Sequence, residues 1–182
     1  MGFDPTGRLL ASASYSGSVA IIDPKTQTVT RTWPAHEGRV YAADFRPDGS
    51  ELTTADQEGF VRGWDPETGA RLREWRVLGG ERVDAIAWSP GGEWLLVTTA
   101  DGMRLYRPDG TIEARLDLAT RTKAAAWTKD GRMVFAGDGR IHVLPLDIRS
   151  WRADPRGLLG AAEAAAGTTL GAMFGIDEKT SP

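Results

Sequence analysis

The sequence repeats itself with a period of about 40 residues, and this periodicity restricts the chain to folds built from stacked units of similar structure. Four turn segments begin with an aromatic residue and end with glycine, and their first residues lie 42, 43 and 39 positions apart. Three of them carry proline at the third position, where it favours a tight turn, and Lys129 takes that place in the fourth. The segments are residues 3–7, 45–49, 88–92 and 127–131.

Two further sets of equivalent positions, here called columns, recur with the same period. One is a proline that ends four short apolar runs, and the other is a glycine that opens each run. The runs are rich in β-branched, aromatic and small residues, and no long stretch with helical spacing occurs before residue 154. In the second repeat they predict strands at residues 40–45, 51–55, 60–64 and 72–76. We therefore expect an all-β fold with about four short antiparallel strands in each repeat.

The second repeat resembles the repeat of the WD-repeat family of β-propellers. Ala35-His36 stands at its start, Phe45-Arg46-Pro47-Asp48-Gly49 forms its turn, and Gly59-Phe60-Val61-Arg62-Gly63-Trp64-Asp65 ends in the Trp-Asp dipeptide of the family. The other repeats lack the histidine and carry other residues in place of the tryptophan. The resemblance covers residues 3–147 and implies a β-propeller segment of about four blades, each with four short antiparallel strands.

The same resemblance implies a buried hydrogen-bonded set inside the second repeat. It would join His36, a hydroxyl on the second strand, an acidic turn residue and the indole of Trp64. Thr54 is the candidate hydroxyl and Glu58 the candidate acid, while Asp65 completes the family dipeptide. We expect these residues to serve the structure of the blade.

The propeller segment is predicted to span residues 1–147, with an incomplete first blade that lacks its innermost strand. Four arrangements stay open: the C-terminal part of a larger propeller, half of a ring completed by a second copy or another chain, a closed four-bladed ring, or an open arc. The chain looks like the C-terminal part of a bacterial multidomain WD-repeat protein. The repeats run roughly over residues 1–35, 36–78, 79–118 and 119–147.

The tail, residues 148–182, differs from the repeats in composition. Asp154-Pro155 resembles a helix N-cap followed by proline at the first helical position, so a short helix is predicted near residues 155–166. Two alternatives stay open: a membrane helix carrying a GxxxG pattern within residues 157–176, and a strand at residues 170–177 that would complete the first blade. The short helix near residues 155–166 would pack on the propeller or on a partner.

Composition narrows the chemistry that the chain can perform. It has 182 residues, no cysteine, two histidines and a formal net charge of −3, which argues against thiolate chemistry and against a protein that neutralises many phosphates of nucleic acid. No nucleotide-binding, metalloprotease or nucleophilic-serine motif occurs in the sequence. Asp44 with Asp48, and Asp56 with Glu58, are the candidate carboxylate pairs, but acids at turns and strand ends are commoner than catalytic pairs. We expect no enzyme activity, no metal and no cofactor.

One column of charged residues suggests a binding surface. Arg39, Arg82 and Arg121 each stand six residues before the aromatic residue of a turn segment. Two residues after each of these arginines, the equivalent positions hold Tyr41, Asp84 and Lys123. In a propeller these loops enter the inner strands around one mouth of the central channel, where guanidinium groups could bind carboxylates of a partner. The alternative is that these side chains are simply solvated.

These observations favour a non-enzymatic scaffold that presents propeller loops to partner proteins, one of which carries an acidic segment. We expect a cytoplasmic protein that binds neither nucleic acid nor membrane, with self-association or a second chain as a possible way to complete the propeller. Two other functions stay open: a small-ligand or enzymatic site in the central channel, and a structural subunit attached through its tail. The predicted inner strands carry mainly alanine, which favours close packing of blades over channel chemistry.

Overall fold

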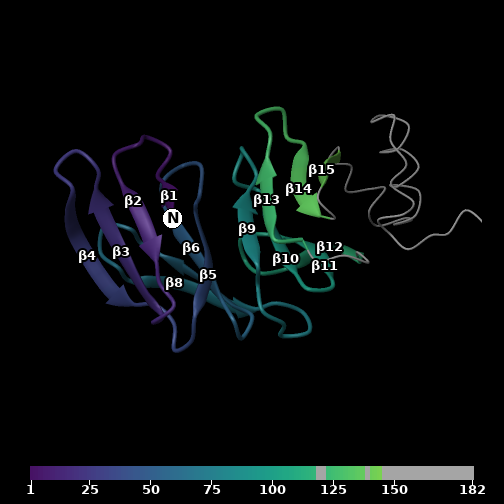
Figure 1. The fold of residues 1–182 in the computed structure, drawn as a ribbon, viewed down its shortest axis with the longest axis horizontal. Coiled ribbons are helices and arrows are strands. Elements are labelled where there is room, and N and C mark those ends of the chain that lie inside the picture. The colour runs from purple at the N-terminus through teal and green to yellow at the C-terminus, as the bar shows by residue number, and fades with distance from the viewer. Residues whose placement is uncertain (118–121, 138–139, 145–182) are drawn as a thin grey trace, which may run out of the picture.

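The computed structural model describes residues 1–117, 122–137 and 140–144, which form fifteen strands in four antiparallel sheets (Figure 1). In each sheet the strands pair with their neighbours in chain order. The all-β fold class is therefore confirmed, and the architecture is consistent with a β-propeller. None of these residues forms a helix long and apolar enough to cross a membrane.

Each of the four sheets is built from strands that are consecutive in the chain. The first contains β1 (Gly2–Phe3), β2 (Leu10–Ala13), β3 (Ser18–Asp23) and β4 (Thr28–Pro34), and the second contains β5 (Val40–Phe45), β6 (Leu52–Asp56), β7 (Phe60–Trp64) and β8 (Arg71–Arg76). The third contains β9 (Ala85–Trp88), β10 (Leu95–Thr99), β11 (Gly102–Tyr106) and β12 (Ile112–Asp117). The fourth contains β13 (Ala124–Trp127), β14 (Met133–Gly137) and β15 (Arg140–Leu144).

The innermost strands lie next to one another across the sheets. Strands β1 and β2 contact β5, β5 contacts β9, and β9 contacts β13, so the four sheets succeed each other as blades in chain order. The first sheet corrects one prediction, because a two-residue strand, β1, occupies the innermost position that was expected to be missing. The predicted tail helix and the alternative strand at residues 170–177 lie outside the residues that the structure describes.

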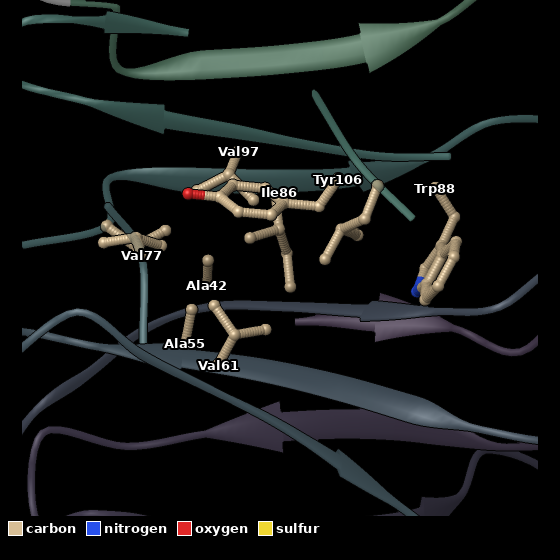
Figure 2. Packing of buried hydrophobic residues seen from close by; sticks show 10 residues of the cluster. Ala42, Ala55, Val61, Val77, Ile86, Trp88, Val97 and Tyr106 are labelled. Atoms are coloured by element: carbon tan, nitrogen blue, oxygen red, sulfur yellow. The ribbon is translucent and has the colours of Figure 1, made fainter. Parts of the chain in front are cut away.

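Apolar side chains pack between successive sheets, and each junction has its own core. Figure 2 shows the junction between the second and third sheets, where Ala55 and Val61 of one sheet face Ile86, Val97 and Tyr106 of the next. A similar core joins the first sheet to the second, and another joins the third to the fourth. Burial of these faces is the main term that holds the blades together.

The column glycines allow tight turns at the junctions. Gly17 has a φ of 87°, and a Cβ there would lie 2.1 Å from the backbone oxygen of His36. Gly59 has a φ of 81°, and its Cβ would lie 2.8 Å from the backbone oxygen of Glu81. Because positive φ and this close approach both exclude larger residues, glycine is required where each turn meets the following loop.

Candidate functional site

The loops that enter the inner strands bring together side chains from three successive blades. Tyr15 lies in the turn between β2 and β3, Arg39 and Tyr41 lie at the start of β5, and Arg82 and Asp84 lie just before β9. Backbone hydrogen bonds fix these segments to one another. The amide of Val40 donates to the oxygen of Ser14, that of Gln57 to Arg39, that of Val83 to Asp56, and that of Asp84 to Thr98.

Two guanidinium groups flank a pair of aromatic rings on this surface. The ring centroids of Tyr15 and Tyr41 are 5.4 Å apart with the planes inclined at 45°. The Cζ atom of Arg39 lies 5.6 Å from the ring centroid of Tyr15, and that of Arg82 lies 4.6 Å from the ring centroid of Tyr41. Stacking on an aromatic ring orients a guanidinium while leaving its edge N–H groups able to donate.

The charges on this surface do not cancel. The Nη2 atom of Arg82 lies 2.8 Å from the Oδ1 atom of Asp84, so this pair is internally neutralised. Burial raises the pKa of Asp84, and Arg82 and Lys123 partly oppose that rise. Arg39 is exposed and forms no ion pair within the part of the chain that the structure describes. Arg39 and Lys123 therefore leave the surface with a positive balance.

The structure thus brings together five of the six predicted binding residues. Arg39, Tyr41, Arg82 and Asp84 form one contiguous group, and Lys123 lies close enough to act on the carboxylate of Asp84. The sixth, Arg121, lies outside the described residues. We call Tyr15, Arg39, Tyr41, Arg82, Asp84 and Lys123 the arginine–tyrosine cluster.

Sequence reasoning missed Tyr15, which links Arg39 to the rest of the cluster. Strand register places Gln57 and Ala100 at the positions equivalent to Tyr15 in the next two blades. Because neither residue is aromatic, the repeat pattern does not single out Tyr15. The one available signal was that Tyr15 is a large aromatic residue at a turn among serines. Its exposure, 67%, is what makes it available to a partner.

The second blade contains the buried hydrogen-bonded set, in which one residue differs from the prediction. The Nδ1 atom of His36 lies 2.8 Å from the Oδ2 atom of Asp56, and its Nε2 atom lies 2.7 Å from the Oγ1 atom of Thr54. The indole of Trp64 donates to the same hydroxyl oxygen at 2.8 Å. Since the carboxylate accepts, Nδ1–H donates to Asp56, and the Thr54 hydroxyl donates to Nε2.

The acid in this set is Asp56, which corrects the prediction of Glu58. Asp56 ends β6 and uses its Oδ1 atom to accept from the backbone amides of Glu58 and Phe60, each at 2.9 Å. Although burial alone would raise it, these bonds and the one from His36 hold the pKa of Asp56 below its ordinary value. The side chain of Glu58 is exposed at the turn. Asp65 caps the following turn, where its Oδ1 atom accepts from the amide of Glu67 at 2.8 Å.

The third blade replaces this set with a buried arginine that the sequence did not single out. Strand register gives Arg104 the position of Arg62, and its side chain is buried. Its guanidinium donates to Thr99 at 2.5 Å, to both carboxylate oxygens of Asp101 at 2.9 and 3.0 Å, and to Glu81 at 3.2 Å. These acids compensate the buried charge, so Arg104 is a structural residue of this blade.

The carboxylate of Asp44, on the innermost strand β5, lines a hollow formed with residues of β9 and β13. Burial raises the pKa of Asp44 to about 6, and the backbone amide of Trp88 donates to its Oδ2 atom at 2.8 Å. Trp127 and Lys129 line the same hollow. Asp48 does not join Asp44, because its carboxylate accepts from Ser50 and faces Arg46. Within the described residues no three metal-ligating side chains come together.

Comparisons with known proteins agree with this architecture. The family model described as "WD domain, G-beta repeat" matches residues 27–65 and 74–103. Over 152 residues the chain is 28% identical to coronin-7 from Rattus norvegicus, an alignment that covers 77% of this chain and 16% of that protein. Over the same length it is 25% identical to small ribosomal subunit protein RACK1y from Oryza sativa subsp. japonica, covering 77% of this chain and 44% of that protein.

The chain therefore carries two segments that match the WD repeat, and it spans less than half of the length of either relative. The two relatives come from a rat and a rice plant, so the resemblance to bacterial multidomain proteins stays a prediction.

Proposed function

We propose that this chain is a non-enzymatic scaffold whose arginine–tyrosine cluster binds an acidic segment of a partner protein. The observation that supports this most is the series of cation–π and aromatic contacts from Arg39 through Tyr15 and Tyr41 to Arg82, which crosses blade boundaries on an accessible surface. Arginine and tyrosine are the residues that most often anchor protein interfaces. An acidic peptide would find one unpaired guanidinium at Arg39 and a second at Arg82 that is already oriented.

The positive charge that Arg39 and Lys123 leave on the cluster makes it selective, because Arg82 and Asp84 neutralise each other. A neutral or basic peptide would meet the exposed cations Arg39 and Lys123 without a compensating charge, whereas carboxylates would replace the water around them. Because the cations Arg39 and Lys123 are exposed, their attraction for an acidic peptide should weaken as the salt concentration rises. We place this activity in the cytoplasm, which stays a prediction from the sequence.

Binding of a defined peptide tests the proposal. The probe is a fluorescein-labelled peptide of alternating glutamate and glycine, followed by fluorescence anisotropy. Replacing both Arg39 and Arg82 by alanine should weaken binding by about tenfold or more, the loss expected for two interfacial guanidinium groups. The matched control removes two exposed arginines from the opposite ends of the strands, Arg8→Ala with Arg132→Ala. Equal affinity of wild type and of the Arg39/Arg82 variant would show that the cluster is not the docking site.

A further inference from the structure

The junction between the third and fourth sheets lacks a side chain that fills the equivalent place at the junction before it. Strand register makes Trp88 and Trp127 equivalent, because each ends the innermost strand of its sheet and pairs with the first residue of the next strand. Four residues further on, Gly92 and Gly131 each donate through the backbone amide to the residue that follows the tryptophan. The two turns can therefore be compared position by position.

At the junction between the second and third sheets, Arg46 fills the space over Trp88. Its Cζ atom lies 5.4 Å from the ring centroid of Trp88, which is buried. The same side chain reaches the turn glycine, because a Cβ on Gly92 would lie 3.2 Å from the Nε atom of Arg46. An ion pair of 3.3 Å between this Nε atom and the Oδ2 atom of Asp48 helps to hold the guanidinium there.

At the next junction a serine takes the place of Arg46, and the space stays open. Ser89 directly follows β9 as Arg46 follows β5. Its hydroxyl oxygen accepts from the amide of Trp94 at 3.0 Å, so this short side chain is held within its own turn. Among the described residues, a Cβ on Gly131 would meet nothing within 4 Å. Trp127 is only half-buried and lines, with Ser89 and Gly131, a groove of about 650 Å³.

Charged side chains of both signs line this groove. Glu93 and Lys129 are exposed there, and neither forms an ion pair within the residues that the structure describes. The other charges of the groove are neutralised in the ion pairs Arg107–Glu113 and Asp130–Arg132. Glu93 can therefore accept from an incoming guanidinium, as Asp48 does from Arg46, and Lys129 would attract a carboxylate next to it.

We propose that this groove, here called the Trp127 groove, binds an arginine side chain of a partner protein. The guanidinium would stack on the indole of Trp127 as Arg46 stacks on Trp88, and it would donate to Glu93. An acidic residue beside that arginine would pair with Lys129. The turns that line the groove follow the inner strands, whereas Arg39 and Arg82 of the arginine–tyrosine cluster precede them, so the two sites lie at opposite ends of these strands.

A short peptide, acetyl-Gly-Arg-Asp-Gly-amide, is the probe, and it is titrated into isotope-labelled protein while the tryptophan indole N–H signals are followed. The indole of Trp127 donates to the backbone oxygen of Ala87 at 2.9 Å, so its signal reports on the groove, and Trp127→Phe assigns it. We expect a saturable shift of Trp127 and none of Trp88, because Arg46 already covers the latter. A peptide with uncharged citrulline in place of arginine should bind about threefold or more weakly.

Two variants of the chain test the residues of the groove. Glu93→Gln removes a carboxylate at an exposed position and should weaken binding of the arginine peptide by about threefold or more. Glu67→Gln, which changes an exposed acid in a turn of the second blade, is the matched control and should bind as the wild type does. Ser89→Arg should abolish binding, because it places a guanidinium of the chain itself over Trp127.

Several outcomes would overturn the proposal. They are equal affinity for the arginine and citrulline peptides, an unmoved Trp127 signal at about 10 mM peptide, and unchanged binding by Glu93→Gln or by folded Ser89→Arg protein. The variant with alanine at both Arg39 and Arg82 should bind the arginine peptide normally, whereas Ser89→Arg should bind the glutamate–glycine peptide normally. Failure of one site is therefore distinguishable from failure of the other.

Discussion

At the residue scale, burial raises the pKa of the Asp44 carboxyl on the innermost strand β5 of its sheet. Its folded-state pKa of about 6 exceeds the ordinary value of 3.8 because burial disfavours the charged carboxylate. The folded chain therefore holds this proton more tightly than the unfolded chain does. The stabilisation from the protonated form is complete below about pH 4 and is lost as the pH rises through 6.

Asp44→Asn should remove this pH dependence while keeping an oxygen that accepts from the amide of Trp88. Between pH 4.5 and 7 the free energy of unfolding of the wild type should fall by about 1–2 kcal/mol relative to that of the variant. Urea denaturation at several pH values measures the difference. Asp48→Asn is the control and should leave the slope between pH 4.5 and 7 unchanged, because a hydrogen bond from Ser50 lowers the pKa of Asp48 and its stabilisation is lost only as the pH falls below that range. A wild-type curve parallel to that of Asp44→Asn would contradict the assignment.

At the scale of the elements, the hydrogen-bonded set ties β6 and β7 to the segment that enters the second blade. Trp64 supplies the indole N–H that Thr54 accepts, and Thr54 also contacts His36. Trp33 is equally buried, but its indole nitrogen has no hydrogen-bond partner among the described residues. The two tryptophans therefore differ in hydrogen bonding while sharing one core, in which their ring centroids lie 5.9 Å apart.

Replacing each tryptophan by phenylalanine isolates the contribution of this hydrogen bond. Trp64→Phe should cost about 1–2 kcal/mol more than Trp33→Phe, because it leaves a buried hydroxyl acceptor without its donor in addition to the smaller ring. The free energy of unfolding from urea titration is the measurement. Equal losses for the two variants would mean that the set contributes only by packing.

The strands could be predicted from the sequence because their signals are local. Strand β5 lies at the expected residues 40–45 and β7 at residues 60–64, since turn residues and alternating apolar positions bound them directly. Local sequence could not show whether Asp56 or Glu58 contacts His36, because both acids lie in one turn. Only the packing of the blade determines that Asp56 reaches His36. Likewise the burial of Arg104 depends on Glu81, 23 residues away.

At the scale of the whole molecule, the sequence predicted which equivalent loop positions carry the candidate site. It did not predict which of their side chains contact one another. The repeat period placed Arg39 and Arg82 at equivalent loops, and the structure sets both beside tyrosines. Nothing in the sequence related Tyr15 to Tyr41, because these rings meet only when the first two blades pack together. The arginine–tyrosine cluster is therefore built by neighbouring blades jointly and by no single repeat.

The most direct test of the account is to locate the acidic peptide on the folded chain by nuclear magnetic resonance. The unlabelled glutamate–glycine peptide is titrated into isotope-labelled protein, and the side-chain signals of arginine and tyrosine are followed. We expect saturable shifts of Arg39, Arg82, Tyr15 and Tyr41, with Arg132 unchanged as the internal reference. Shifts confined to other residues, or no shift at peptide concentrations that saturate anisotropy, would contradict it.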